Sequence, residues 1–246
     1  MKTKIGKIPV FIIAGMYIIP AFFLTLFFSK YQFLNLILNE LWFVLYTLAM
    51  YKSENNCFEG RKAFVERKSI LLMISLFAFS LFLAFTCLNL RLRNSTYTIV
   101  ESKISLYIVC SYLFTCILTP IVEECIFRKI IIGRLLEKHS ALFSIIISSF
   151  LFGMLHLATG DIFFGIEVCL VSLIYGYVYM KTKNLLYSIT MHCAHNMVVV
   201  FSEESNNVDL FILNKYLYIY IVFAFIFLLI SILLLRKIYI SKRCKA

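Results

Sequence analysis

The sequence carries little charge: Asp, Glu, Lys and Arg make up only 15% of its 246 residues. A soluble domain has about 25% charged residues, and 62% of this chain is hydrophobic. Too few charged groups remain to cover a surface in water, so we expect an integral membrane protein. The net charge of +11 is then assigned to loops beside a membrane, and nucleic-acid binding is excluded. With three prolines and eight glycines, collagen and low-complexity disorder are excluded as well.

Apolar residues occur in eight long stretches. A bilayer core about 30 Å thick requires roughly 20 apolar residues of helix. The stretches cover residues 8–29, 33–51, 69–90, 104–128, 142–158, 162–180, 185–201 and 216–235. We therefore predict an all-α fold of about eight transmembrane helices with a polar site buried in the bundle. We divide the chain into N-terminal helices (1–103), a catalytic membrane domain (104–202) and a last helix with a basic tail (203–246).

The basic residues are distributed unevenly between the two sides of the predicted bundle. With the N-terminus inside the cell, 19 of the 24 Lys and Arg lie on the cytoplasmic side and five lie outside. Cytoplasmic loops carry the excess of Lys and Arg, so we predict that both termini face the cytoplasm. An even number of helices agrees with two basic termini on one side. The predicted location is a bacterial plasma membrane.

The eight cysteines do not form the pattern of a disulfide framework. Six of them fall within apolar stretches, and Cys57 and Cys244 lie on the predicted cytoplasmic side. Since no predicted outer loop contains a cysteine, nothing in the sequence requires an oxidising compartment.

Several ionisable residues fall inside the apolar stretches. Each costs about 2.5–3.5 kcal/mol on insertion scales, so each is a functional candidate. They are Glu40, Glu123, Glu124, Glu167, His156, His192 and His195, with the amide Asn196 beside them. Glu167 lies about five residues below the predicted outer surface and belongs to none of the motifs given below. We expect it to pair locally or reach outward, so that Glu167→Gln leaves catalytic activity nearly intact.

The two adjacent glutamates in the fourth stretch point to different faces of the predicted helix. Glu124 and Arg128 are four residues apart and can pair on one helix face, whereas Glu123 points about 100° away and can stay unpaired. The spacing alone also fits a helix end at the membrane surface with solvated acids and bases.

Helix lengths place these polar groups at one depth. Glu123 lies about 15 residues, or roughly 22 Å, before the turn near Lys138, and His156 lies roughly 24 Å beyond Ser140. His192 lies roughly 12 Å beyond Asn184. The groups therefore meet in the cytoplasmic half of the membrane, about 10–15 Å below its surface.

Three segments of the chain carry a motif set. They are Glu123-Glu124-Cys-Ile-Phe-Arg128, Phe152-Gly-Met-Leu-His156 and His192-Cys-Ala-His-Asn196. Together they resemble the CPBP family of intramembrane proteases, which comprises the type II CAAX prenyl proteases and bacteriocin-processing or immunity proteins. The resemblance covers about residues 105–200, and the motifs do not include His195.

The resemblance implies a role for each motif residue. Glu123 would activate water, His156 would position it, and His192 and Asn196 would face the oxyanion, with Glu124, Arg128 and Phe152 in support. Members of the family have been described both as metal-free glutamate proteases and as metalloproteases. We expect no cofactor, because Asn196 suits an oxyanion donor better than a zinc ligand. Zinc on Glu123, His156 and His192 remains the alternative.

Other protease chemistries lack their residues in this sequence. It contains neither His-Glu-x-x-His nor Gly-x-Ser-x-Gly, and its only aspartates, Asp161 and Asp209, lie in predicted outer loops. We expect membrane lipid and a peptide or protein substrate as partners. The Ile, Phe, Lys and Asn bias indicates an AT-rich genome, which favours bacteriocin or pheromone processing or self-immunity. A non-catalytic membrane scaffold or regulator and an ion-coupled transporter remain as alternative functions.

Overall fold

The computed structural model describes residues 8–53, 67–93, 105–157, 162–204 and 210–243, and these contain helices and no strand. The helices are α1 (Val10–Phe28), α2 (Gln32–Ser53), α3 (Arg67–Arg93), α4 (Leu106–Leu113), α5 (Thr119–Glu124), α6 (Gly133–Leu136), α7 (Ala141–His156), α8 (Ile162–Thr182), α9 (Leu185–Glu204) and α10 (Leu210–Arg243). Two π-helical segments, Phe114–Leu118 and Cys125–Ile132, connect α4, α5 and α6 into one continuous helix.

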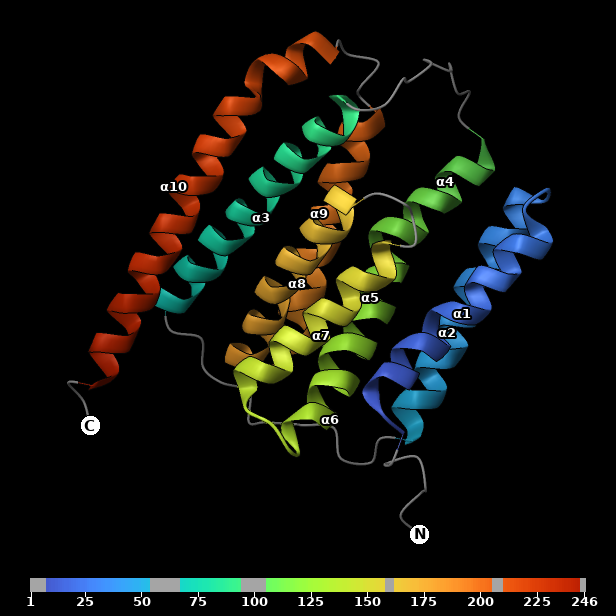
Figure 1. Cartoon of the computed structure of the whole chain (residues 1–246), viewed down its shortest axis with the longest axis horizontal. Helices are drawn as coiled ribbons and strands as arrows, with labels where there is room; N and C mark the ends of the chain where they lie inside the picture. Colours follow the sequence, from blue (N-terminus) through green and yellow to red (C-terminus); the bar gives the residue numbers. More distant parts are fainter. Residues whose placement is uncertain (1–7, 54–66, 94–104, 158–161, 205–209, 244–246) are drawn as a thin grey trace.

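The helices confirm the predicted multi-pass membrane fold. Six are long and apolar enough to cross a bilayer, and Ala141–His156 and Leu185–Val200 are shorter apolar helices. These eight segments coincide with the eight apolar stretches of the sequence. The start of α1 and the end of α10 lie at the same end of the bundle (Figure 1), as an even number of crossings requires. Which end faces the cytoplasm stays a prediction.

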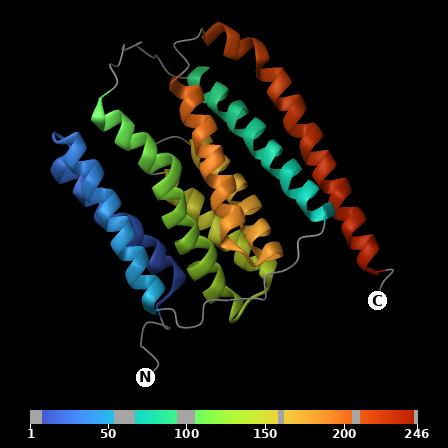
Figure 2. The same ribbon diagram turned by 180° about the vertical axis from the view of Figure 1, so that it is seen from behind.

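The bundle has a central group of helices with a pair on each flank (Figures 1 and 2). The hairpin α1–α2 covers one flank, and α3 pairs with α10 on the other. Between them, α4 to α9 pack against one another. The first hundred residues therefore contribute to both sides of the central group.

A cluster of almost fully buried apolar residues lies beside the Glu-Glu motif. Ile126, Phe127 and Ile130 are almost fully buried and pack against Tyr17 of α1 and Phe152 of α7. Large apolar side chains on α1, α2, α7 and α10 are exposed, as expected of helices whose outer surface contacts lipid.

Two local features fix how the central helices meet. Between α8 and α9, Lys183 adopts a left-handed backbone conformation with φ 54°, and the Asn184 side chain accepts a 3.0 Å hydrogen bond from the Leu186 amide. This tight turn sets the register of α9. Between α7 and α8, a Cβ atom on Gly153 would lie 2.6 Å from Cβ of Cys169, so only glycine permits the observed approach of the two helices.

The cysteines that the structure describes form no disulfide, as the sequence predicted; they are Cys87, Cys110, Cys116, Cys125, Cys169 and Cys193. Cys57 and Cys244 lie outside the described residues.

Candidate active site

A cavity of about 270 Å³ lies between the α4–α5 helix, α7, α8 and α9. Its lining includes the four predicted catalytic residues, Glu123, His156, His192 and Asn196. Three helices that are separate in the sequence thus bring these side chains to one place, which confirms the common depth expected from helix lengths.

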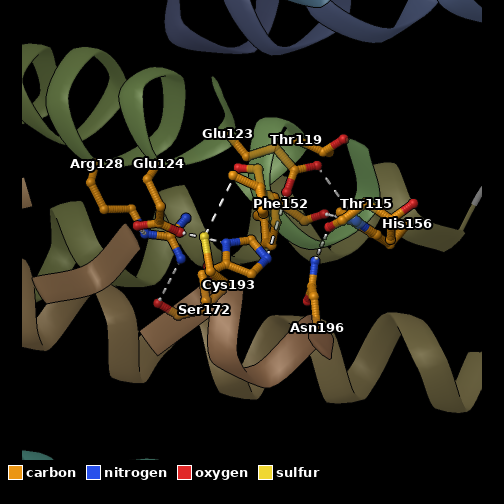
Figure 3. A network of polar contacts seen from close by, with 12 residues as sticks. Thr115, Thr119, Glu123, Glu124, Arg128, Phe152, His156, Ser172, Cys193 and Asn196 are labelled. Atoms are coloured by element: carbon orange, nitrogen blue, oxygen red, sulfur yellow. Dashed lines mark hydrogen bonds and ion pairs between the residues drawn. The ribbon is translucent and has the colours of Figure 1, made fainter. Parts of the chain in front are cut away.

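Glu124 and Arg128 form the predicted ion pair beside this cavity. Arg128 Nε lies 2.9 Å from Glu124 Oε2, and both side chains are buried. The guanidinium lies over the rings of Phe152 and Tyr175, 5.2 and 5.7 Å from their centroids, and Nη2 donates a 3.4 Å hydrogen bond to the Ser172 carbonyl. Figure 3 shows Glu124 and Arg128 side by side, with Ser172 below them. The buried cation is therefore matched by an anion, a carbonyl and two aromatic faces.

Glu124 also holds His192, a contact that the sequence did not predict. His192 Nδ1 lies 3.0 Å from Glu124 Oε1. Because a carboxylate paired with Arg128 only accepts hydrogen bonds, Nδ1 carries the proton and donates it. The bond fixes the orientation of the imidazole, and its Nε2 atom lies 3.7 Å from Glu123 Oε2.

His156 is oriented by its own helix. Its Nδ1 atom lies 2.8 Å from the Phe152 carbonyl, which can only accept, so Nδ1–H is the donor. The imidazole also packs against the Phe152 ring at a centroid distance of 4.6 Å. Both contacts join residues four apart, which explains the Phe-x-x-x-His spacing. His156 Nε2 then lies 3.9 Å from Glu123 Oε1.

The carboxylate of Glu123 thus has one imidazole facing each of its oxygens. The separations of 3.7 and 3.9 Å are longer than a direct hydrogen bond, and the described residues give this carboxylate no other hydrogen bond. A water molecule that contacts Glu123 and either ring would have hydrogen-bond distances on both sides.

Asn196 satisfies a carbonyl that a proline leaves without a donor. The Thr119 amide donates to the Phe114 carbonyl, the spacing of a π-helix. The next residue, Pro120, has no N–H, so the Thr115 carbonyl lacks a donor within its helix. Asn196 Nδ2 donates to it at 2.9 Å, as Figure 3 shows. One amide hydrogen of Asn196 is thereby used, and the second is available to the cavity.

The same π-helical segment aligns three cavity residues. Residues four and eight apart drift by about 40° and 80° around an α-helix, and the wider π turn offsets this drift. Thr115, Thr119 and Glu123 consequently all line the cavity. The sequence analysis did not predict this segment; the Thr119-Pro120 dipeptide is the signal from which it could have been expected.

The side chains that the structure describes do not form a metal-binding group. Among the described residues, no three His, Cys, Asp or Glu side chains come close enough to hold a metal ion. Two donors about 2.1 Å from a tetrahedral zinc ion would lie about 3.4 Å apart, less than both separations around Glu123. We therefore derive no step through a metal.

Glu167 faces the interior of the bundle rather than its outer surface, and its effect on cleavage stays a prediction. It is 4% exposed and lines the same cavity as Glu123, together with His195 and Tyr175. It does pair locally, as expected: His195 Nε2 lies 3.5 Å from Glu167 Oε1. Counting residues from the helix end gave its depth, but the face it occupies depends on how α8 is rotated against α9.

The N-terminal hairpin reaches the site through Glu40. Its Oε1 atom accepts a 3.0 Å hydrogen bond from Thr119, which lines the cavity. A second, larger cavity of about 550 Å³ lies between α1, α2 and the motif helices and shares Glu123, Phe152 and His156 with the first. Glu123 and His156 therefore lie where a polar and a mostly apolar cavity meet.

Comparisons with known proteins fall on the segment that carries these motifs. Residues 105–198 match the model of the type II CAAX prenyl endopeptidase Rce1-like family. The chain is 36% identical over 87 residues to "Putative membrane peptidase YdiL" of Bacillus subtilis (strain 168). This aligned segment covers 35% of this chain and 34% of that protein. No solved structure matches the chain significantly. The two matches confirm the resemblance of this segment to the CPBP family, and they support a membrane-embedded protease.

Proposed function

We propose that this protein is an intramembrane endopeptidase in which Glu123 activates water to hydrolyse a peptide bond. The observation that carries the proposal is the arrangement around Glu123. One carboxylate without a direct hydrogen bond faces two oriented imidazoles at 3.7 and 3.9 Å, inside a cavity of a membrane-spanning bundle.

The first step follows from the orientation of these groups. A water molecule beside Glu123 gives one proton to the carboxylate while its oxygen attacks the carbonyl carbon of the peptide bond. His156, held by the Phe152 carbonyl, positions this water through Nε2. Glu123 then transfers the proton to the leaving nitrogen as the C–N bond breaks, and the carboxylate is restored.

The oxyanion that forms between these steps needs donors. The Glu124 carboxylate accepts from His192 Nδ1 and so holds the imidazole with Nε2 toward Glu123, where Nε2 would donate to the oxyanion once the ring takes up a second proton. The second amide hydrogen of Asn196 is the other candidate donor. Loss of one such donor typically lowers the rate by about 10²–10³, so both side chains are assigned to transition-state stabilisation.

The substrate class follows from the surroundings of the site. The larger cavity is lined mainly by apolar residues, most of them from α1, and reaches Glu123 and His156. It suits the apolar side chains of a membrane-associated peptide or protein. Within this class we favour a role in bacteriocin or pheromone processing or in self-immunity, in the plasma membrane and without a cofactor.

The test compares Glu123→Gln with Glu137→Gln, a matched change at an exposed carboxylate. Both variants and the wild type are reconstituted in liposomes with a library of membrane peptides, and products are identified by mass spectrometry. Glu123→Gln retains size and polarity but removes the proton acceptor, so turnover should fall by about 10²–10⁴ at unchanged expression. Glu137→Gln should cleave like the wild type.

A complementation assay separates the protease from a scaffold that retains the fold. A scaffold requires only shape and partner surface, and Glu123→Gln preserves both. Full complementation by Glu123→Gln at matched expression would therefore exclude the protease as the biological role.

A further inference from the structure

Glu167 and His195 form a second carboxylate–imidazole pair in the cavity of Glu123. The two side chains are 4% and 6% exposed, and His195 Nε2 lies 3.5 Å from Glu167 Oε1 without hydrogen-bond geometry. Neither residue belongs to the three motifs, and neither has a part in the mechanism above.

The polar atoms around this pair are incompletely satisfied. Within the described part of the chain, His195 Nδ1 and the Tyr175 hydroxyl are buried without a hydrogen-bond partner, and the Glu167 carboxylate accepts no hydrogen bond. The Tyr175 ring lies between the two imidazoles, 5.1 Å from His192 and 6.4 Å from His195. Buried polar groups normally have a partner in the protein, in ordered water or in a ligand, so this part of the cavity offers polar atoms that water or a polar group of a ligand can satisfy.

The charges that line the cavity favour a cation as that group. The lining contains two carboxylates, Glu123 and Glu167, and three imidazoles, but no Lys or Arg. The nearby Arg128 is committed to Glu124. A cavity in a low-dielectric bundle with two acids and no fixed cation attracts positive charge and repels a carboxylate.

The shape of the cavity sets where such a cation would lie. The cavity follows α9 for eight residues, or roughly 12 Å. Its lining from this helix comprises His192, His195, Asn196, Val199 and Val200. A peptide in extended conformation advances about 3.3 Å per residue, so about three or four residues fit. His195 lies three residues beyond His192, roughly 4.5 Å along the helix, which corresponds to one or two substrate residues from the bond at Glu123.

We propose that Glu167 and His195 form a specificity subsite for a cationic group of the substrate. The ligand is a Lys or Arg side chain, or a free amino terminus, one or two residues from the cleaved bond. Glu167 binds the cation, and His195 positions the carboxylate. The inference rests on the proposed protease function. A cation subsite would distinguish this chain from a protease that binds the free C-terminal carboxylate of its substrate in the same cavity.

Binding is measured first, without turnover. Glu123→Gln protein in nanodiscs of neutral phosphatidylcholine is titrated with dansyl-labelled apolar peptides of about ten residues. Each carries one Lys, moved along the series, and each has a counterpart with norleucine at that position. At one or two adjacent positions Lys should bind about tenfold more tightly than norleucine. The ratio should fall to about twofold or less when Glu167→Gln is added and persist when Glu137→Gln is added.

A conservative change tests the role of the charge. Glu167→Asp added to Glu123→Gln keeps the carboxylate and should retain part of the Lys preference, which a purely structural role would not predict. No preference for Lys at any position, or a preference that survives Glu167→Gln, would overturn the subsite.

Hydrolysis of the same peptides by the wild type separates this inference from the proposed function. The Lys preference should recur in kcat/KM, mainly through KM, at the same positions. A binding preference with no cleavage of any peptide would retain the subsite and refute the protease. Cleavage without a charge preference would retain the protease and refute the subsite.

Discussion

Replacing Glu124 with Gln removes a charge that two buried donors share. Glu124 Oε2 lies 2.9 Å from Arg128 Nε, and Oε1 accepts from His192 Nδ1 at 3.0 Å. A glutamine has the same shape but only one oxygen, and its NH₂ group must face one of these donors. If this group faces Arg128, the buried guanidinium keeps the Ser172 carbonyl and two aromatic faces but loses its anion. If it faces His192, the imidazole loses its acceptor, and the negative charge is lost in both cases.

The expected cost is large relative to the stability of a protein. Removing one partner of a buried ion pair typically costs about 3–5 kcal/mol, and total stabilities are about 5–15 kcal/mol. Glu124→Gln should therefore lower both yield and thermal stability, and it should reduce activity because His192 loses its anchor. Glu123→Gln should differ, because its carboxylate has no direct hydrogen bond to lose, and should give a stable but slow protein.

The assay is a thermal unfolding curve in detergent, with membrane yield, for a double-mutant cycle. Arg128→Met fills the space of the guanidinium without charge, so Glu124→Gln with Arg128→Met should recover much of the stability lost by Glu124→Gln alone. Glu137→Gln serves as the exposed control. Wild-type stability for Glu124→Gln, or a double variant as unstable as the sum of both single changes, would refute the ion-pair reasoning.

Three further predictions concern packing, metal and orientation. Gly153→Ala places a Cβ 2.6 Å from Cβ of Cys169, so it should separate α7 from α8, displace His156 and lower activity; full activity and stability would contradict this close packing. Stripping with a strong chelator should leave hydrolysis intact, whereas stoichiometric zinc whose removal abolishes activity and whose return restores it would make the enzyme a metalloprotease. Membrane-impermeant thiol reagents applied to intact cells should not label Cys57 or Cys244, and labelling of either would reverse the predicted orientation.

The elements that could be predicted from the sequence are those fixed by helix geometry. A rise of about 1.5 Å per residue was enough to bring Glu123, His156 and His192 to one depth, and a spacing of four residues was enough to pair Glu124 with Arg128. Both results follow from distances along a single helix or a helical hairpin, which the sequence contains.

The contacts that the sequence did not predict depend on how helices are rotated against each other. The Glu124–His192 bond and the entry of Glu167 into the cavity both depend on the faces that α8 and α9 present. These faces are set by packing at Gly153 and by the turn at Lys183. The link from Glu40 to Thr119 joins residues 79 apart in the sequence, and no local pattern reports it.

The sequence distance between each buried ionisable residue and the residue it contacts affects how the chain enters the membrane. During synthesis the helices emerge in order, and an uncompensated ionisable group is costly inside lipid. The cation of Arg128 finds its anion four residues away in the same helix, and Glu167 of α8 finds His195 in the helix that follows directly. The Glu40 contact with Thr119 and the Glu124 contact with His192, in contrast, wait for helices made much later. The charge of Arg128 can therefore be neutralised as soon as its own helix is made, and Glu167 gains a polar neighbour with the next helix, so this part of the bundle can be inserted stepwise rather than all at once.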